Sequence, residues 1–403
     1  MLDESRKDVV QRLRDVPTGV MSFHFGQIAD VTNMVSCAIW VCTPNHLLAR
    51  HLFGESERLK DRTTVAAITA EVLNLAAANG VQHGRRSPQE SGRPRVCAQE
   101  EVMDPTSIRD GAAALMRRVP RLRGHGRVSI AINSLFLSAG VKPIIVAPMY
   151  LGHRLILDGR VDSHVWAAYS GRYDDQHIKT LTRLLPKGGV ALDVGANIGF
   201  YSVPLAKAAK LNGGRVVAFE PFPGNVERLR DNIELNGLTS IADIRAVGLS
   251  DTNGSAMLEL RDDFIHGDTG NAVIVRGDQA QSQWQRVAVP LVTLDELWPR
   301  LRLDRLDVVK ADIEGHEVQF MKGASKTLST FRPVIQLEVN RGHYEPRGID
   351  IGSAFKGAVP DNYRFASLGN AGNLALLEDI TAHAGEDIYA IPAEQAGEIC
   401  RAK

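Results

Sequence analysis

Glycines and one polar residue follow a predicted strand in a pattern that suits a small ligand. Ala191–Ser202 (ALDVGANIGFYS) is predicted as an apolar strand, a turn that holds Gly195 and Gly199, and the start of a helix. Glycine lets the backbone approach a ligand, and the first turn of a helix offers unpaired amides. The G-x-x-x-G spacing, with Asn197 inside the turn, departs from the G-x-G-x-x-G pattern that receives a pyrophosphate. It favours a ligand with a zwitterionic amino-acid tail, and a tight structural turn is the alternative.

A carboxylate at the end of the next predicted strand would extend this binding site. Arg215–Glu220 is that strand, and Glu220 is its last residue. An acidic residue at this position can accept hydrogen bonds from both ribose hydroxyls of an adenosine, and a helix-capping carboxylate is the alternative. Asp193 is expected to hold the amides of the loop or to face the ammonium group of the ligand, where an ionised carboxylate is favoured.

A third segment carries residues that could react with an acceptor or position it. Leu306–Glu317 (LDVVKADIEGHE) contains a strand that ends in Asp312, and Glu314 follows. Alternation along a strand puts Lys310 and Asp312 on the same face. Reacting groups gather at the carboxyl ends of the strands in an open α/β sheet. A carboxylate there can accept the proton of an attacking hydroxyl or orient that hydroxyl.

Two further residues belong to this prediction, and the segment also has a purely structural interpretation. Glu338 has a similar position at the end of the next strand, and His316 either faces a substrate or is an ordinary residue at a helix start. The structural interpretation is an ion pair between Lys310 and Asp312, with Glu314 or Glu317 favouring the N-terminus of the following helix.

Strands and helices alternate from about residue 185 onward, and they would bring these residues to one edge of a sheet. His177–Leu185 is predicted as an amphipathic helix that ends before Pro186. Near-continuous apolar strands between helices are typical of a parallel sheet covered on both faces. The sequence therefore predicts a doubly wound α/β domain. Its predicted strands are Val190–Val194, Arg215–Glu220, Asp243–Val247, Leu306–Asp312, Pro333–Val339, Tyr363–Leu368 and Asp387–Ile391.

Residues Arg154 to about Pro392 resemble the FkbM family of S-adenosylmethionine (SAM)-dependent methyltransferases. The resemblance implies the class I methyltransferase fold, a Rossmann-like, mostly parallel seven-stranded sheet, here preceded by an α-rich N-terminal extension. It also implies O-methylation of a hydroxyl group, commonly on a sugar or a secondary metabolite. Six phrases carry the resemblance together: GRYDDQ (Gly171–Gln176), DVGANIG (Asp193–Gly199), FEP (Phe219–Pro221), VTLDEL (Val292–Leu297), VVKADIEGHE (Val308–Glu317) and PVIQLE (Pro333–Glu338).

The resemblance also implies a cofactor and a set of site residues. SAM is the expected cofactor, and the expected acceptor is a hydroxyl of a small molecule or glycan, methylated by direct in-line displacement. The residues expected to bind the cofactor are Asp193, Gly195, Ala196, Asn197, Gly199, Glu220, Pro221 and Val247. The expected catalytic residues are Asp312, Glu314 and Glu338, with Asp312 or Glu314 as the base or orienting group. No metal ion is expected, although these carboxylate oxygens are hard ligands and metal assistance stays open.

One position departs from the family, and one region has no counterpart in it. The approach segment has Asp174 where the family usually has glutamate, so this carboxylate reaches one methylene less far. Residues 1–125 are predicted as an N-terminal region of unknown role that is partly helical, with a polar linker at about 82–96. Its predicted helices are Asp3–Leu13, Thr64–Ala78 and Asp104–Val119. Residues 126–403 are the predicted methyltransferase domain; strand-like alternation begins at Arg127, and Arg154–Asp158 and Val165–Ser170 are edge strands or a lid.

Length and composition limit the class of protein. The 403 residues exceed a typical single domain. Because 47 basic residues balance 47 acidic ones, the net charge argues against a nucleic-acid partner, which needs a surplus of positive charge. The four cysteines lack metal-ligand spacing. No signal peptide is recognisable, and the apolar run Met34–Cys42 is too short to span a bilayer. We therefore expect a cytoplasmic protein without a membrane span; its oligomeric state cannot be read from the sequence.

Three alternatives remain beside the predicted O-methyltransferase. A ribose or other nucleic-acid methyltransferase would share the fold, and Lys310, Asp312 and Glu338 could supply three of the four residues that ribose methylation needs. A non-catalytic SAM-binding interaction protein would leave the function to the N-terminal region. A nicotinamide-dependent oxidoreductase is disfavoured by the G-x-x-x-G spacing.

Overall fold

The chain divides into two compact units, residues 1–142 and residues 143–403. The computed structural model describes residues 104–119, 124–260, 272–275, 285–369, 372–383 and 385–401. The helices predicted at 3–13 and 64–78, the linker at 82–96 and three of the four cysteines lie outside the described residues. The domain boundary at residue 125 stays a prediction, as does the cytoplasmic location.

The first unit contributes two described helices, α5 (Pro105–Met116) and α6 (His125–Ser138). Helix α5 was predicted, because Pro105 suits the first position of a helix. The strand-like pattern expected from Arg127 is wrong, since these residues form α6. Its buried residues recur at helical spacing and are mostly polar: His125, Ser129, Asn133 and Phe136. The alternating apolar residues that suggested a strand are therefore not the ones that the helix buries.

The second unit begins with a two-stranded antiparallel sheet and two helices. Strands β1 (Ile144–Pro148) and β2 (Arg154–Asp158) pair with each other, so the predicted strand at 154–158 is confirmed. The strand predicted at 165–170 is wrong, because these residues belong to helix α7 (Asp162–Ser170). Six of the nine residues of this short helix are buried, among them the polar His164 and Ser170, so no regular polar face reveals a helical period. Helix α8 (Asp175–Leu184) follows, close to its predicted position.

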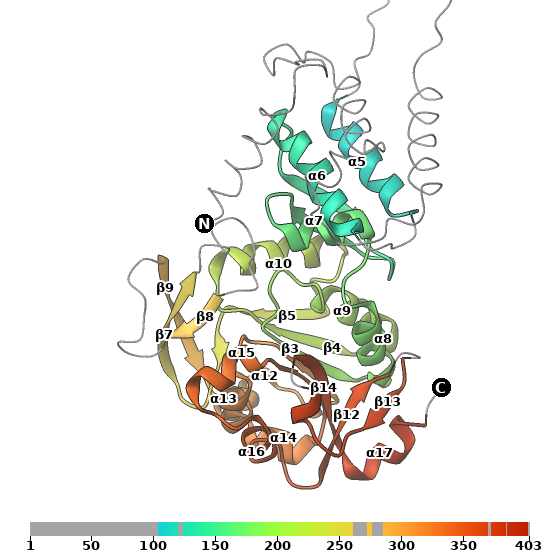
Figure 1. Cartoon of the computed structure of the whole chain (residues 1–403). Helices are drawn as coiled ribbons and strands as arrows, with labels where there is room; N and C mark the ends of the chain where they lie inside the picture. Colours follow the sequence, from blue (N-terminus) through green and yellow to red (C-terminus); the bar gives the residue numbers. More distant parts are fainter. Residues whose placement is uncertain are drawn as a thin grey trace, which may run out of the picture. The chain divides into compact units, whose positions relative to one another are not determined.

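An eight-stranded sheet forms the centre of the second unit (Figure 1). Its order is β13-β12-β14-β11-β10-β3-β4-β5, and the five strands from β11 to β5 are parallel. Strand β14 is antiparallel to both β11 and β12. The strands are β3 (Val190–Val194), β4 (Arg215–Phe219), β5 (Ala242–Arg245), β10 (Val308–Ala311), β11 (Val334–Val339), β12 (Tyr363–Leu368), β13 (Leu374–Leu376) and β14 (Glu386–Pro392).

All seven predicted strands are present, and the short edge strand β13 is an addition that was not predicted. Helices cover both faces of the sheet, so the doubly wound α/β prediction is confirmed. In Figure 1, α8, α9 (Ser202–Asn212) and α10 (Pro223–Leu235) follow one face. The other face carries α12 (Leu294–Leu301), α13 (Glu317–Gly323), α14 (Ser325–Phe331) and α16 (Ile351–Lys356). This arrangement is the class I methyltransferase fold.

The buried strand residues explain why the sheet forms. Every residue of β3 and of β10 is buried. Their apolar side chains pack with those of β11 and of the covering helices, including Leu192, Val309, Ile335 and Phe320. Such strands gain most of their stability from burial on both faces. The parallel register aligns Lys310 with Asp193, and Asp193 with Ala218.

A second, four-stranded sheet lies between β5 and α12 in the sequence. Its order is β6-β9-β7-β8, and its strands are β6 (Gly248–Leu249), β7 (Gly254–Leu260), β8 (Ala272–Val275) and β9 (Gln285–Val292). The remaining elements are α15 (Arg341–Tyr344), the 3₁₀ turns η3 (Glu345–Arg347) and η4 (Thr381–His383), and α17 (Ala393–Ile399). None of the helices in the described ranges is both long and apolar enough to cross a membrane.

Candidate functional site

The carboxyl ends of β3, β4 and β10 border one cavity. Parallel strands present these ends at the same edge of a sheet, which is where open α/β sheets bind ligands. The second sheet contributes apolar residues to the wall, among them Leu249 and Leu258. Eight of the predicted site residues line the cavity: Gly195, Ala196, Asn197, Glu220, Pro221, Val247, Asp312 and Glu314.

The loop after β3 is pressed against the loop after β10. A Cβ atom on Gly195 would lie 2.0 Å from the carbonyl oxygen of Asp312, and the φ angle of Gly195 is +78°. Only glycine fits both conditions. The amides of Gly195 and Ala196 donate to the carbonyl oxygen of Phe219, at 3.0 and 2.9 Å. Asn197 takes a left-handed conformation, with φ of 50°, which is uncommon outside glycine and marks a constrained position.

Glu220 connects the second strand to this loop. One of its carboxylate oxygens accepts from the amide of Asn197 at 2.8 Å, and the other accepts from the amide of Phe222 at 2.9 Å. The side chain is only 6% exposed. Burial raises the pKa of Glu220 to about 7, against the lowering effect of these hydrogen bonds. The carboxylate therefore has a structural role in the loop, and it also lines the cavity with lone pairs left to accept from a ligand.

A buried lysine links the ends of β3 and β10. The ammonium of Lys310 lies 3.3 Å from Asp312 Oδ2 and 3.7 Å from Asp193 Oδ1, and it donates to the carbonyl oxygen of Gly195 at 3.1 Å. Burial opposes the charge of Lys310, but the carboxylates of Asp312 and Asp193 outweigh it and raise the pKa of the lysine. The ion pair between Lys310 and Asp312 expected on the structural interpretation is thus present. Asp312 remains 39% exposed on its cavity side.

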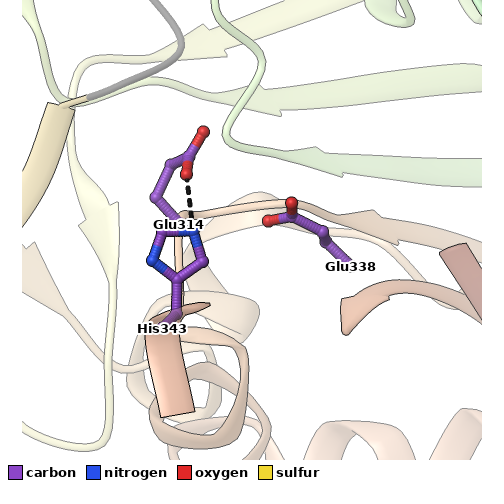
Figure 2. Close-up of side chains that lie close together, drawn as sticks. All are labelled: Glu314, Glu338 and His343. Atoms are coloured by element: carbon purple, nitrogen blue, oxygen red, sulfur yellow. Dashed lines mark ion pairs between the residues drawn. The ribbon is translucent and has the colours of Figure 1, made fainter. Parts of the chain in front are cut away.

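Carboxylates crowd the ends of β10 and β11 (Figure 2). Glu314 has a φ angle of 55°, and its Oε2 atom lies 2.9 Å from Nε2 of His343. Glu338 accepts one long hydrogen bond, from Asn340 Nδ2 at 3.4 Å. Burial, followed by the charges of Asp312 and Glu314, raises the pKa of Glu338 to about 9. Burial also raises the pKa of Glu314, against the opposing hydrogen bond from His343.

Comparison with known proteins assigns a family to most of the second unit. The model of the methyltransferase FkbM domain matches residues 193–365. This segment is an FkbM methyltransferase domain. The match covers the loop after β3, Glu220 and the predicted catalytic residues Asp312, Glu314 and Glu338. The expected family is therefore confirmed for the part of the chain that carries the candidate site.

Two curated proteins are similar over this FkbM domain. The hexuronic acid methyltransferase AglP of Haloferax volcanii is 27% identical over 178 residues, which are 44% of this chain and 67% of that protein. The methyltransferase sdnD of Sordaria araneosa is 29% identical over 168 residues, 35% of this chain and 62% of that protein. A solved FkbM methyltransferase from Methylobacillus flagellatus is 14% identical with a TM-score of 0.34, covering 71% of this chain and 58% of that one.

Three predicted site residues of the FkbM domain do not line the cavity. Asp193 is fully buried, and its Oδ2 atom accepts from the hydroxyl of Ser202 at 2.5 Å. Gly199 faces Leu229 of α10. Glu338 does not line the cavity but lies close to Glu314 and His343. The roles of these residues stay predictions.

His316 is tied to the protein and not to the cavity. It is 6% exposed, and its Nε2 atom lies 2.9 Å from the hydroxyl of Ser250. It occupies the position before α13, which agrees with the interpretation as a helix-start residue. The neighbouring Glu317 is also buried, and it accepts from the amides of Ile313 and Gly315. These bonds fix the loop that carries Glu314.

The cavity of the FkbM domain also has an aromatic wall that the sequence did not reveal. The ring of Tyr173 stacks on that of Phe200, with centroids 3.8 Å apart and planes at 13°. Tyr201 lies beside them and also lines the cavity. Tyr173 belongs to the approach segment that carried part of the resemblance, so the signal was present, but nothing in the spacing placed the ring against the loop after β3.

The shortened carboxylate of the approach segment lies close to this wall. Asp174 Oδ2 accepts from the hydroxyl of Tyr201 at 3.4 Å. Burial raises the pKa of Asp174. On its other side, Tyr201 accepts from Gln336 Nε2 at 3.1 Å, and the same nitrogen donates to Asp387 at 2.8 Å. Asp174 is therefore one member of a polar network behind the cavity wall.

Proposed function

We propose that this protein is a SAM-dependent O-methyltransferase that acts on a hydroxyl group of a small molecule or glycan. One observation carries the proposal: the glycine loop and Glu220 share a single cavity with Asp312 and Glu314. The first pair suits an adenosyl cofactor with an amino-acid tail, and the second pair suits a hydroxyl that must be oriented and deprotonated. On this proposal, the methyl donor and the acceptor bind side by side in the cavity.

The residues around the first half of the cavity fit SAM. The Glu220 carboxylate can accept from ribose hydroxyls, as in other adenosine-binding α/β folds. The carbonyl-rich turn and the side chain of Asn197 can meet the ammonium and carboxylate of the amino-acid tail. Val247, Leu249 and Leu258 give an apolar surface for a flat base.

When bound, SAM supplies an electrophilic methyl group on a sulfonium. The chain's own residues would act on the acceptor. Asp312 or Glu314 accepts a hydrogen bond from the acceptor hydroxyl, holds its oxygen in line with the methyl carbon and takes its proton as the new bond forms. Lys310 holds the Asp312 carboxylate in place from the buried side. Transfer from bound SAM would leave a methyl ether on the acceptor, S-adenosylhomocysteine as the second product, and the hydroxyl proton on the carboxylate.

The acceptor class is supported by the relatives. AglP is named for methylation of a hexuronic acid, and hydroxylated sugars are acceptors that the proposed chemistry can use. The chain spans 67% of AglP and 62% of sdnD, so the activity of the whole protein is part of the proposal.

The test is a direct search for methyl transfer. The full chain is incubated with SAM and a panel of uronic acids, neutral sugars and hydroxylated metabolites, and products are detected by mass spectrometry. We expect a mass gain of one methylene on a hydroxylated acceptor, and none on the matched acceptor whose hydroxyls are already methylated. If the chain binds a nicotinamide dinucleotide and not SAM, the proposal is wrong. Binding of SAM without turnover on any acceptor would favour an interaction protein instead.

A further inference from the structure

Three side chains from separate elements converge beside the cavity. Glu314 comes from the loop after β10, Glu338 from the end of β11 and His343 from helix α15 (Figure 2). One ligand atom from each of the three lies within 4.8 Å of the other two. The set combines two carboxylate oxygens with one imidazole nitrogen. Both atom types are common metal ligands.

The two carboxylates of the cluster receive few hydrogen bonds from the protein. Glu338 Oε2 is buried and has no hydrogen-bond partner within the ranges that the structure describes. The basic group in contact with Glu314 is His343 itself, at 2.9 Å. Lys310 instead forms ion pairs with Asp193 and Asp312. A buried carboxylate oxygen without a partner is costly. A positively charged ligand between the three side chains would remove this cost.

Contacts within the protein fix the backbone that carries Glu314 and His343. Glu317 accepts from the amides on both sides of Glu314. A Cβ on Gly315 would lie 2.5 Å from that of His343, so only a glycine lets His343 pack against this loop. Asn340, which accepts from the amide of Gly342 at 3.0 Å, caps the helix that carries His343. Preorganised ligands favour metal affinity because little has to be ordered on binding.

We propose that Glu314, Glu338 and His343 bind one divalent metal ion of the first transition row, such as Mn²⁺. Imidazole suits such ions better than Mg²⁺, while two carboxylates suit a hard ion of this group. Three ligand atoms that are each about 2.1 Å from one ion lie about 3 to 3.6 Å from one another. The three atoms, which lie within 4.8 Å of one another, would therefore move together by about 1 Å on binding an ion.

The position of the ion gives it a role next to the acceptor. Glu314 lines the cavity, whereas Glu338 and His343 are not among its lining residues. An ion held by all three would have open positions toward the cavity, where it can bind the acceptor oxygen and make its proton easier to remove. This role rests on the proposed methyltransferase function, but binding of the ion does not.

The experiment measures Mn²⁺ binding without SAM or acceptor. Mn²⁺ is titrated into the metal-stripped full chain, and free Mn²⁺ is followed by electron paramagnetic resonance. We compare the wild type with Glu338→Gln and His343→Gln. The matched control is His383→Gln, because His383 also pairs with a carboxylate, that of Glu386 at 3.0 Å, but lies outside the cluster. We expect both cluster variants to bind about tenfold or more weakly and the control to bind as the wild type does.

Two results would overturn the proposal. Either the wild type binds no Mn²⁺ at millimolar concentrations, or both cluster variants bind it as the wild type does. Thermal melting of the metal-stripped variants shows that they are folded, and added Mn²⁺ should raise the melting temperature of the wild type and of His383→Gln alone. The experiment measures Mn²⁺ binding and no methyl transfer. Its result can therefore be interpreted even if the proposed enzyme activity is not found.

Discussion

The two halves of the cavity differ in how their carboxylates are satisfied. At the ends of β3 and β4, Asp193 accepts from a serine hydroxyl and Glu220 from two backbone amides. At the ends of β10 and β11, Glu338 has one long hydrogen bond and Glu314 has one histidine. Among the described residues, Asp193 Oδ1 has no hydrogen bond, but the Lys310 ammonium lies 3.7 Å from it and balances its charge. Glu338 Oε2 also has no hydrogen bond there, and the charge of the second half is left for a proton, a cation or a ligand to neutralise. This contrast agrees with a fixed cofactor side and an acceptor side that is completed on binding.

We expect the largest effect from a substitution of Gly195, where the loops after β3 and β10 are in contact. In Gly195→Ala the new Cβ would lie 2.0 Å from the carbonyl oxygen of Asp312, so the loops must separate. We expect a loss of about 3 kcal/mol in the free energy of unfolding, together with a loss of SAM binding. Gly237→Ala is the matched control, because Gly237 has a similar φ of +63° and no atom within 4 Å of its Cβ position. It should cost only about 1 kcal/mol. Urea unfolding of the full chain measures both, and equal losses would contradict the close contact.

The pH dependence of cofactor binding should report the ionisation of Glu220. Its pKa is raised to about 7 from 4.5, and a carboxylate that accepts two ribose hydroxyls must be ionised. We therefore expect SAM affinity to fall up to about tenfold for each pH unit below 7. Isothermal titration from pH 5.5 to about 8.5 measures this, and the Glu220→Gln variant should give a flatter curve. Curves of the same slope in both proteins would exclude Glu220 as the titrating group.

The raised pKa of Glu220 affects the stability of the cofactor-free protein in the opposite direction, because it stabilises the fold at low pH. Because the pKa of Glu220 in the folded chain lies above its unfolded value, the folded state holds the proton more tightly. Its contribution is complete below about pH 4.5 and is lost as the pH rises through about 7. Urea unfolding of the wild type minus that of Glu220→Gln, measured at several pH values, isolates this term. A difference that grows with pH would contradict it.

The aromatic wall should give the smallest effect. Tyr173 stacks on Phe200 at the cavity, so Tyr173→Leu removes a flat surface and should weaken SAM binding by about 1 kcal/mol. Tyr150 is 54% exposed and is not among the residues that line the cavity, so Tyr150→Leu should leave binding unchanged. Isothermal titration compares the two variants, and a similar loss in both would assign the effect to the general fold.

The sequence predicted the central sheet well because its strands carry long buried apolar runs. The strand ends also placed Glu220 and Asp312 correctly at the cavity, since carboxyl ends of parallel strands meet at one edge. Helix α7 was missed because six of its nine residues, polar ones included, are buried, and α6 was missed because its buried positions are mostly polar. In both cases the hydrophobic period that separates helix from strand is absent.

His343 could not be predicted from the sequence for a different reason. It lies on a four-residue helix outside every phrase that supported the family resemblance. Its approach to Glu314 depends on close packing against Gly315, which is a tertiary contact between segments distant in the sequence. Tyr173 shows the same limit, because its stack on Phe200 joins the approach segment to the loop after β3. Residues on strand ends follow from topology, whereas these follow only from packing.

The most direct test of the division between the two halves compares Glu220→Gln with Asp312→Asn. SAM affinity is measured by isothermal titration, and turnover is measured at saturating SAM with the best acceptor found. We expect Glu220→Gln to weaken SAM binding about tenfold or more. Asp312→Asn should retain SAM affinity and lower turnover by about 10²–10⁴-fold. Full turnover in Asp312→Asn, or unchanged SAM affinity in Glu220→Gln, would contradict the assignment of a cofactor side and an acceptor side.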